Sequence, residues 1–397
     1  MTHADSATFD RAVKALDSFQ IEIPSWGFAN TGTRFGKYVQ DAAASTLEEK
    51  FSDAAEVMRL TGSTSTLALH VLWDLPNGVR DVEQVRAMES RYGIRSGSIN
   101  PNLFQNQEYK YGSLCNPSAE IRQHANQHLL ESIEIATQLG SRDLSLWLPD
   151  GSNYPGTQSI RKRIAWLEES LSIAHAHLAP YQRLLIEYKP FEPAFYHTDI
   201  ADWGMSSHLS RTAGPQARVL VDTGHHYSSQ NIEQIVAWLL HTGLLGGFHF
   251  NDRRYADDDL TLGSIDPYQI FRIFHEILSA QEDGLNLDIA FMVDQSHNLK
   301  GKVEATVQTV VTAQELWVKA ALLDRRELAQ LQQSCDLVAA EELFRGAFWN
   351  DVRPLTQAWR VARGLPANPI EALRDGGYVE RVARERAGRQ TRVGSYA

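Results

Sequence analysis

The sequence predicts an α/β fold in which eight parallel strands alternate with helices and close into a (β/α)8 TIM barrel, followed by an α-helical C-terminal extension. Three observations lead to this prediction. Short apolar, β-branched runs alternate with longer amphipathic stretches, and such alternation indicates parallel strands joined by crossover helices. There are eight such runs, the number that closes this barrel. Each run also carries a polar or aromatic residue at or near its end, where the fold places its active site.

The predicted strands are five to eight residues long. Pro24 interrupts the first run and weakens it as a strand, because proline cannot donate a hydrogen bond to its neighbour. In chain order the runs are IEIPSW (21–26), TLALHV (66–71), IRSGSIN (94–100), DLSLWL (143–148), LLIEYK (184–189), RVLVD (218–222), LGGFHF (245–250) and LDIAFMVD (287–294).

The stretches between the strands are predicted to be amphipathic helices. They cover residues 46–60, 81–92, 118–139, 160–178, 232–240, 267–279 and 303–323. We assign residues 1–325 to the barrel, with a short N-terminal helical segment, and residues 326–397 to the helical extension. Its last part, ERVARERAGRQTRVGSYA, is basic. A frayed, solvated tail is one interpretation; we favour helices that contact a neighbouring subunit, with a mobile final dozen residues.

Composition excludes several classes of protein. The 397 residues carry 49 acidic and 38 basic side chains, a net charge of -11, so the chain lacks the basic face that nucleic acid binding requires. Cys115 and Cys335 are the only cysteines, which fits a reducing compartment without a disulfide framework. No signal peptide and no apolar run long enough for a membrane span is found. We therefore expect a soluble, cytoplasmic protein.

The last residues of the strands suggest a metal site. Taken singly, His70, Trp26 and Trp147 are more typical of a packed core, and only the coincidence across strands carries weight. Charged or imidazole groups end consecutive strands and would converge on one barrel mouth, where buried carboxylates need a cation. The strand ends are Trp26, His70, Asn100, Trp147, Glu187, Asp222, His249 and Asp294.

The stretch HFNDRRYADDD (249–259) crowds four aspartates behind a histidine. A solvated acidic turn is one interpretation, and a divalent cation held by carboxylate and imidazole is the other. Asp257 and Asp259, two residues apart, would face the same side of an extended loop.

Two further spacings add groups to this cluster. Asp222 and His225 are three residues apart and would share a face if a helix begins there, whereas His226 would be structural. Lys189 would lie on the same side of its strand as Glu187 and could bind a substrate oxygen. The alternative for Lys189 is a salt bridge that offsets the acidic cluster.

Seven blocks of sequence resemble L-rhamnose isomerase, in the bacterial branch with broad aldose–ketose specificity and a xylose-isomerase-like TIM barrel. They follow one order from about residue 19 to residue 324, and DVRPL (351–355) continues the resemblance. The blocks are WGFANTGTRFGKY (26–38), LALHVLWD (67–74), SRDLSLWLPDGSNYPG (141–156), LIEYKPFEPAFYHTD (185–199), VDTGHH (221–226), HFNDRRYADDDL (249–260) and FMVDQSHN (291–298).

The resemblance implies two divalent metal ions per subunit, usually Mn²⁺ with Co²⁺ or Mg²⁺ as alternatives, and a homotetramer. The first, structural ion would be bound by Glu187, Asp222, His249 and Asp294. The second, catalytic ion would share Asp222 and also be bound by His225, Asp257 and Asp259.

The resemblance also implies roles at the substrate. His70 would lie over the sugar near its ring oxygen, Lys189 would bind an oxygen near the reacting carbons, and Phe35 would reach a neighbouring subunit's site. The catalytic candidates are Lys189, His70 and Asp294, and the substrate-binding candidates are Trp147, His70, Lys189, Trp26 and Phe35.

The expected activity is the interconversion of L-rhamnose and L-rhamnulose, with other aldoses and ketoses as further substrates. A metal-assisted 1,2-hydride shift and an enediol route both remain open, and the shortage of an uncommitted carboxylate favours the shift. No organic cofactor is expected, because the sequence has no G-x-G-x-x-G or P-loop motif. The alternatives are a ketose epimerase and a non-catalytic sugar-binding protein; a phosphodiester-cleaving barrel enzyme is disfavoured by the acidic charge.

Overall fold

The computed structural model describes residues 3–388 except 31–37, 193–195, 256 and 298. Eight parallel strands form one sheet in the order β1-β2-β3-β4-β5-β8-β9-β10. A parallel bridge between Glu22 and Met292 brings the two ends of the sheet together, which confirms the predicted TIM barrel. The strands are β1 (Ile23–Pro24), β2 (Thr66–His70), β3 (Arg95–Asn100), β4 (Asp143–Leu146), β5 (Arg183–Glu187), β8 (Ala217–Asp222), β9 (Leu245–Phe250) and β10 (Ala290–Val293).

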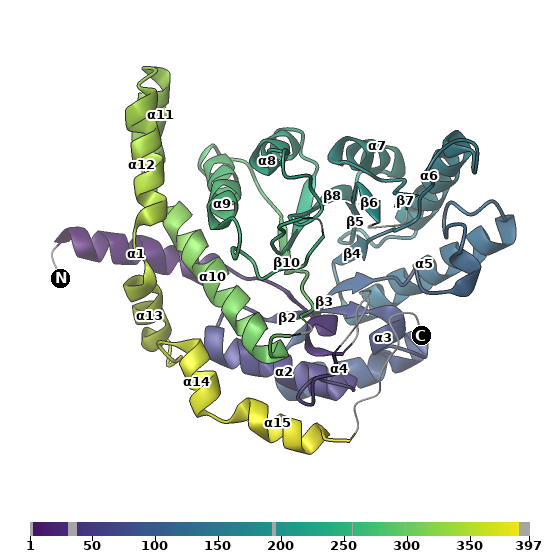
Figure 1. Ribbon diagram of the computed structural model, residues 1–397, viewed down its shortest axis with the longest axis horizontal. Helices are drawn as coiled ribbons and strands as arrows, with labels where there is room; N and C mark the ends of the chain where they lie inside the picture. The colour runs from purple at the N-terminus through teal and green to yellow at the C-terminus, as the bar shows by residue number, and fades with distance from the viewer. Residues whose placement is uncertain (1–2, 31–37, 193–195, 256, 298, 389–397) are drawn as a thin grey trace.

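Helices cover the outside of the barrel (Figure 1). Large apolar side chains fill the layer between strands and helices, while Leu185, Leu220 and Met292 form a separate small cluster. Gly246 is required here, because a Cβ atom at that position would lie 2.6 Å from Leu185 Cδ2 and 2.4 Å from Arg218 Cβ. The helices of the barrel are α1 (His3–Ser18), α2 (Leu47–Thr61), α3 (Val71–Asp74), α4 (Val82–Tyr92), α5 (Ala119–Leu139), α6 (Ile160–Ala176), α7 (Trp203–Ala213), α8 (Ile232–His241), α9 (Pro267–Glu282) and α10 (Lys302–Leu322).

Two features differ from the sequence-based expectation. The first strand is only two residues long and runs into a 3-10 helix (Ser25–Phe28), because Pro24 cannot continue a ladder. Between β5 and β8 the chain adds a hairpin of β6 (Phe191–Glu192) and β7 (Tyr196–His197), followed by α7. The expected helices elsewhere are present.

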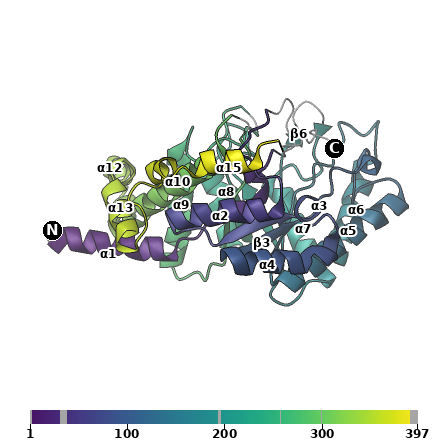
Figure 2. The same cartoon turned by 90° about the horizontal axis from the view of Figure 1, so that it is seen from below.

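The C-terminal extension is helical, as expected. Figure 1 shows α11 and α12 projecting away from the barrel, and Figure 2 shows α15 running along α2. Arg386 of α15 pairs with buried Asp53 of α2 at 2.8 Å, so the first of the final dozen residues, which were expected to be mobile, is held in place; residues 389–397 lie outside the described part. The extension comprises α11 (Arg325–Gln333), α12 (Leu337–Trp349), α13 (Arg353–Ala362), α14 (Pro369–Asp375) and α15, the last spanning Tyr378–Arg386.

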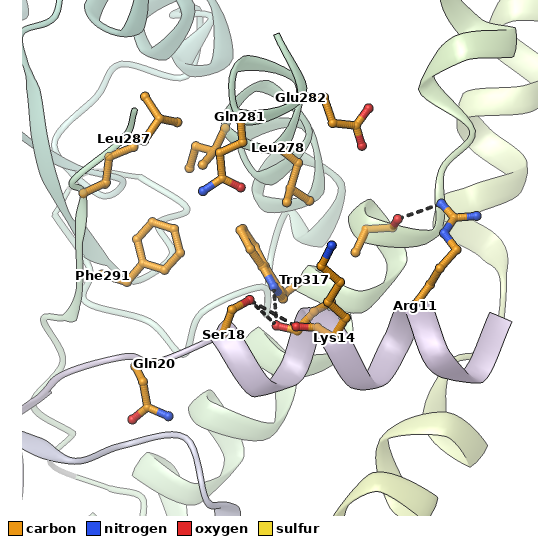
Figure 3. A pocket seen from close by; sticks show the side chains of 14 residues that line it. Arg11, Lys14, Ser18, Gln20, Leu278, Gln281, Glu282, Leu287, Phe291 and Trp317 are labelled. Carbon is orange, nitrogen blue, oxygen red and sulfur yellow. Dashed lines mark hydrogen bonds between the residues drawn. The ribbon is translucent and has the colours of Figure 1, made fainter. Parts of the chain in front are cut away.

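Among the described residues, no helix combines the length and apolar character needed to cross a membrane. A surface pocket lies between α1, α9 and α10, at the end of the barrel where the strands begin (Figure 3). Phe291 and Trp317 line it together with Arg11 and Lys14. None of the described site residues lines it.

Candidate functional site

Four side chains from the ends of four strands meet inside the barrel mouth. Glu187 ends β5, Asp222 ends β8, His249 lies in β9 and Asp294 follows β10. One ligand atom from each lies within 4.8 Å of the others. The first three residues are at most 3% exposed. This is the first ligand set predicted from the sequence, and its carboxylate and imidazole donors fit a divalent cation.

The cluster has polar atoms that the protein alone does not satisfy. Glu187 Oε1 and His249 Nδ1 are buried without a well-formed hydrogen bond among the described residues, although His249 Nδ1 lies 3.2 Å from Glu187 Oε2 and His225 Nδ1 lies 3.2 Å from Glu187 Oε1. Buried polar groups are normally hydrogen bonded, and a buried carboxylate and imidazole that lack such bonds are suited to hold a cation. The residues present therefore fit a metal ion.

The electrostatics of these residues lead to the same conclusion. Burial and the charge of Glu187, partly opposed by His225, raise the pKa of Asp222 to about 7. Burial disfavours charge on His249, but the Glu187 carboxylate outweighs it and raises the pKa of His249 to about 9. Without a cation the protein holds its negative charge by taking up protons, and a divalent ion would displace them.

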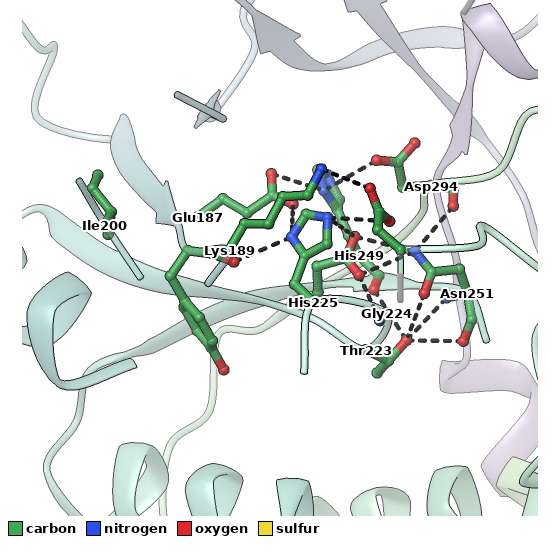
Figure 4. A network of polar contacts seen from close by, with 12 residues as sticks. Glu187, Lys189, Ile200, Thr223, Gly224, His225, His249, Asn251 and Asp294 are labelled. Atoms are coloured by element: carbon green, nitrogen blue, oxygen red, sulfur yellow. Dashed lines mark hydrogen bonds and ion pairs between the residues drawn. The ribbon is translucent and has the colours of Figure 1, made fainter. Parts of the chain in front are cut away.

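Asn251 holds the Asp222 carboxylate in place and was not identified from the sequence. Its fully buried amide donates to Asp222 Oδ1 and Oδ2, both at 3.1 Å, and to the Asp294 carbonyl oxygen at 3.2 Å. Gly224 donates its backbone N–H to Asp222 Oδ1 at 2.6 Å, and Figure 4 shows Gly224 and Asn251 side by side in this network. Asn251 lies two residues after His249, so the two-residue period of a strand could have indicated it.

A second group of residues adjoins the cluster. His225 Nε2 lies 3.9 Å from Asp222 Oδ2 and 3.4 Å from Asp257 Oδ1. Residues 223–226 form a turn rather than the expected start of a helix, yet the spacing of three still brings His225 back to Asp222. Lys189 Nζ pairs with Asp257 Oδ2 at 2.8 Å, so the salt bridge considered for Lys189 exists beside the cluster.

The acidic stretch divides into two kinds of aspartate. Asp252 accepts backbone hydrogen bonds from Ile265 at 2.7 Å and Asp266 at 2.9 Å. Asp258 accepts from the backbone N–H of Tyr255 at 2.8 Å. These two carboxylates fix the shape of the loop, so only some of the four aspartates in the acidic stretch face the cluster.

The sequence predicted that this loop is extended, but it is not. Asp259 has a left-handed backbone with φ of 45°, so the alternation of a strand does not apply to Asp257 and Asp259. Their grouping on one ion is therefore not supported by that argument and stays a prediction from the resemblance.

Aromatic side chains complete the site. Trp26 Nε1 donates to Asp294 Oδ1 at 2.9 Å, and the Trp26 ring lies 4.9 Å from the His70 ring. Phe104 packs edge-on against His70 at 5.7 Å and Trp147 at 5.0 Å. Phe104 was not identified from the sequence, although it lies in the loop after β3, where this fold places functional residues.

The contacts form a closed ring around the barrel mouth. Lys189 Nζ lies 5.2 Å from the centre of the Trp147 ring, which joins the aromatic wall to the ionic cluster. In order, the ring passes through Asp294, Trp26, His70, Phe104, Trp147, Lys189, Asp257, His225, Glu187 and His249 and returns to Asp294.

Asp222, Asp259 and Asn100 are not among the ten residues of this ring, and Asp222 belongs to the four-residue cluster instead. Asn100, counted among the strand ends, is buried and donates to the Leu69 carbonyl oxygen at 3.2 Å, which is a structural role. Phe35 lies outside the described residues.

Comparison with known proteins identifies the family. The model of the xylose isomerase-like TIM barrel family matches residues 56–278. A probable sugar isomerase of Rhizobium meliloti is 37% identical over 94% of this chain and 88% of its own length. The chain also resembles in fold a 3-keto-D-glucoside 4-epimerase from E. coli, with 13% identity, a TM-score of 0.54 and coverage of 76% and 99% of the two chains. A D-allulose 3-epimerase from Methylomonas sp. gives 13% identity, a TM-score of 0.53 and coverage of 74% and 95%. The chain belongs to the xylose isomerase-like TIM barrel family.

Proposed function

We propose that this protein is a divalent-metal-dependent aldose–ketose isomerase that interconverts L-rhamnose and L-rhamnulose and accepts related sugars. The observation that carries the proposal is the closed ring, because it places a carboxylate–imidazole cluster, a buried lysine and an aromatic wall around one space. Carboxylates and a cation suit polar sugar oxygens, and aromatic rings suit the apolar faces of a sugar. The naming of the R. meliloti relative as a probable sugar isomerase supports the same class.

We assign two ions to the ring, most often Mn²⁺. The first ion would be held by Glu187, Asp222, His249 and Asp294. The second would share Asp222 and take His225, Asp257 and Asp259, which is supported for His225 by its short distances to Asp222 and Asp257. When bound, a divalent cation would chelate neighbouring sugar oxygens and polarise the carbonyl.

The protein's own residues supply the remaining functions. Lys189 is only 4% exposed, and its ammonium would stabilise negative charge on the sugar oxygen near the reacting carbons. Trp147 Nε1 is buried without a partner among the described residues, so it is available to donate to a sugar oxygen. Trp26 and Phe104 would exclude water from the sugar.

We favour direct transfer of hydrogen between C1 and C2. The carboxylates of Glu187, Asp222 and Asp294 belong to the proposed ligand set, and Asp257 pairs with Lys189. None of these four is placed to act as an independent base on carbon. An isomerisation of L-rhamnose run in deuterated water tests this choice, because direct transfer carries the C2 hydrogen of the aldose to C1 of the ketose, while an enediol route lets that hydrogen exchange with solvent deuterium.

The experiment that tests the proposed function is product analysis on a panel of sugars with Mn²⁺-loaded protein. L-rhamnose should yield L-rhamnulose, identified by NMR. A ketose epimerised at C3, with no aldose formed, would replace the isomerase by the epimerase alternative. Binding of sugar without turnover would support the non-catalytic alternative.

We further propose a homotetramer in which the C-terminal extension contacts a neighbouring subunit. The helix α12 carries exposed apolar side chains, with Leu337 70%, Val338 74% and Trp349 73% exposed. Apolar side chains concentrated on a projecting element are typical of association surfaces.

A further inference from the structure

The buried guanidinium of Arg163 joins three connections at the barrel mouth. Arg163 lies near the start of α6, which follows β4, and it is fully buried. Its Nη2 donates to Asp199 Oδ2 at 2.6 Å and its Nε donates to Asp199 Oδ1 at 3.0 Å. Its Nη1 donates to the Tyr111 carbonyl oxygen at 2.9 Å and to Gln158 Oε1. Tyr111 belongs to the connection after β3 and Asp199 to the connection after β5.

These three connections are also tied to one another around the guanidinium. Asp150, in the loop after β4, accepts the backbone N–H of Ser113 at 2.6 Å. The Asp150 carbonyl oxygen accepts the backbone N–H of Asp199 at 2.9 Å. Little space remains between them, because a Cβ atom on Gly112 would lie 3.0 Å from Arg163 Nη2 and 3.3 Å from Asp150 Oδ2. A shift of one connection would therefore be felt by the others.

Asp199 belongs to the segment that fixes the backbone of Lys189. The Lys189 N–H donates to the Ile200 carbonyl oxygen at 2.9 Å, and the Thr198 hydroxyl donates to the Lys189 carbonyl oxygen. Thr198 and Ile200 are both buried and flank Asp199 in the chain. Arg163 thus holds the residue that lies between the two hydrogen-bond partners of the Lys189 backbone.

The same segment holds the loop that begins at Trp147. An antiparallel bridge joins Gly151 to Thr198, and Lys189 Nζ lies 5.2 Å from the centre of the Trp147 ring. The hydrogen bonds of Arg163 itself go to groups outside the ring of residues that encloses the barrel mouth. Arg163 can therefore act on Lys189 and Trp147 only through their supporting loops.

A guanidinium is suited to this task. It is planar and presents five N–H donors in fixed directions, so it can bond a carboxylate with two of them and a carbonyl oxygen with a third. A lysine ammonium keeps the charge but not this fixed fork. The bidentate pair with Asp199 therefore sets a geometry as well as balancing a charge.

We propose that Arg163 is a positioning residue that sets Lys189 and Trp147 against the sugar through Asp199. The inference rests on the proposed function, since it concerns a sugar bound by these two side chains. The charge pair would keep the Lys189 ammonium in its place before the sugar arrives. Misplacing a group by about 1 Å can cost about a hundredfold in rate, so loss of Arg163 should be costly although it touches no substrate.

Hydrogen exchange measured by mass spectrometry tests this link without any turnover. With Mn²⁺ present, Arg163→Met should raise amide exchange at residues 147–152 and 197–201 and leave β8 and β9 at the wild-type rate. The matched control is Arg360→Met, which removes another buried guanidinium, bonded to Gln314 Oε1 at 2.7 Å and to the Ala367 carbonyl oxygen at 3.1 Å. It should raise exchange only around α10 and α13. Wild-type exchange at 147–152 and 197–201 in Arg163→Met would overturn the proposal.

Kinetic coupling between Arg163 and Lys189 tests the functional consequence. Arg163→Met should lower kcat for L-rhamnose by about tenfold to a hundredfold, whereas Arg360→Met should leave kcat near the wild-type value. Residues that act as one unit have non-additive effects, so the double variant Arg163→Met/Lys189→Met should lose much less than the product of the two single losses. A purely structural Arg163 would lower the melting temperature and give losses that multiply, and that result would overturn the proposal.

The variant Arg163→Lys keeps the test available if Arg163→Met does not fold. It retains a positive charge beside Asp199, so no carboxylate is left buried alone, but it loses the bidentate bond. We expect raised exchange at 197–201 and a kcat about tenfold lower. Wild-type exchange and wild-type kcat in Arg163→Lys would overturn the proposal. If no sugar is converted at all, the exchange measurements still decide the positioning role, so its failure is distinguishable from failure of the proposed function.

Discussion

Replacing Lys189 by methionine separates its proposed catalytic role from a structural one. The Nζ–Oδ2 distance of 2.8 Å to Asp257 corresponds to an attraction of about 6 kcal/mol at an effective dielectric constant of about 20. Desolvation of both groups cancels part of this, and breaking such a buried pair costs about 3–5 kcal/mol. Metal-free Lys189→Met should therefore have a clearly lower melting temperature than metal-free wild type.

Bound metal should change this outcome. A cation beside Asp257 replaces the charge of the lost ammonium, so the difference in melting temperature should shrink in Mn²⁺-loaded protein. The kcat should nevertheless fall by about a hundredfold or more, the scale for losing one donor to developing negative charge. Calorimetry with and without Mn²⁺, and steady-state kinetics on L-rhamnose, measure both quantities.

The control is Arg386→Met, which removes another buried cation from its carboxylate partner, Asp53, on the outside of the barrel. It should lower the melting temperature with or without metal and leave kcat near the wild-type value. If Lys189→Met behaves like Arg386→Met, with lower stability and unchanged kcat, then Lys189 serves only to offset the acidic cluster.

Three further predictions concern the ions, pH and assembly. Asp257→Asn should reduce turnover severely while one ion stays tightly bound at near-normal stability, whereas His249→Ala should lose metal and lower the melting temperature. Elemental analysis measures the bound metal and calorimetry measures the melting temperature. If both variants lose the same ion and the same stability, the division into two metal sites is contradicted. Burial raises the pKa of Asp150 from 3.8 to about 6, so its contribution to stability is complete below pH 3.8 and is lost as the pH rises through 6. The melting temperature of Asp150→Asn should therefore rise relative to that of wild type between pH 4 and pH 8. A difference in melting temperature that stays constant with pH would refute the burial argument. Trp349→Asp should reduce the molar mass measured by light scattering if α12 contacts another subunit, and an unchanged mass would exclude that contact.

The sequence predicted the barrel and the first ligand set because both depend on short-range patterns. A strand ends where its apolar run ends, and parallel strands bring their ends together. Glu187, Asp222, His249 and Asp294 could thus be grouped without knowledge of any distance. The meeting of these four side chains follows from topology more than from loop structure.

Loops were predicted less well, because their hydrogen bonds depend on tertiary contacts. The acidic stretch looked like a uniform cation site, but Asp252 and Asp258 bond backbone N–H groups that no sequence pattern reveals. Phe104 reaches His70 and Trp147 only because the loop after β3 folds over the barrel mouth.

The surroundings of Arg163 were equally beyond the sequence. Asp199 lies 36 residues and Tyr111 52 residues from Arg163 along the chain. Such positioning depends on several elements at once, so single-sequence reasoning could name Lys189 but not the residues that hold its backbone.

The most direct test of the central claim is metal removal and restoration. Protein stripped by a chelator and shown by elemental analysis to be metal-free should not convert L-rhamnose to L-rhamnulose. Adding Mn²⁺ or Co²⁺ should restore the activity and raise the melting temperature, since binding to the folded state adds to its stability. Full activity in protein confirmed to be metal-free would contradict the account.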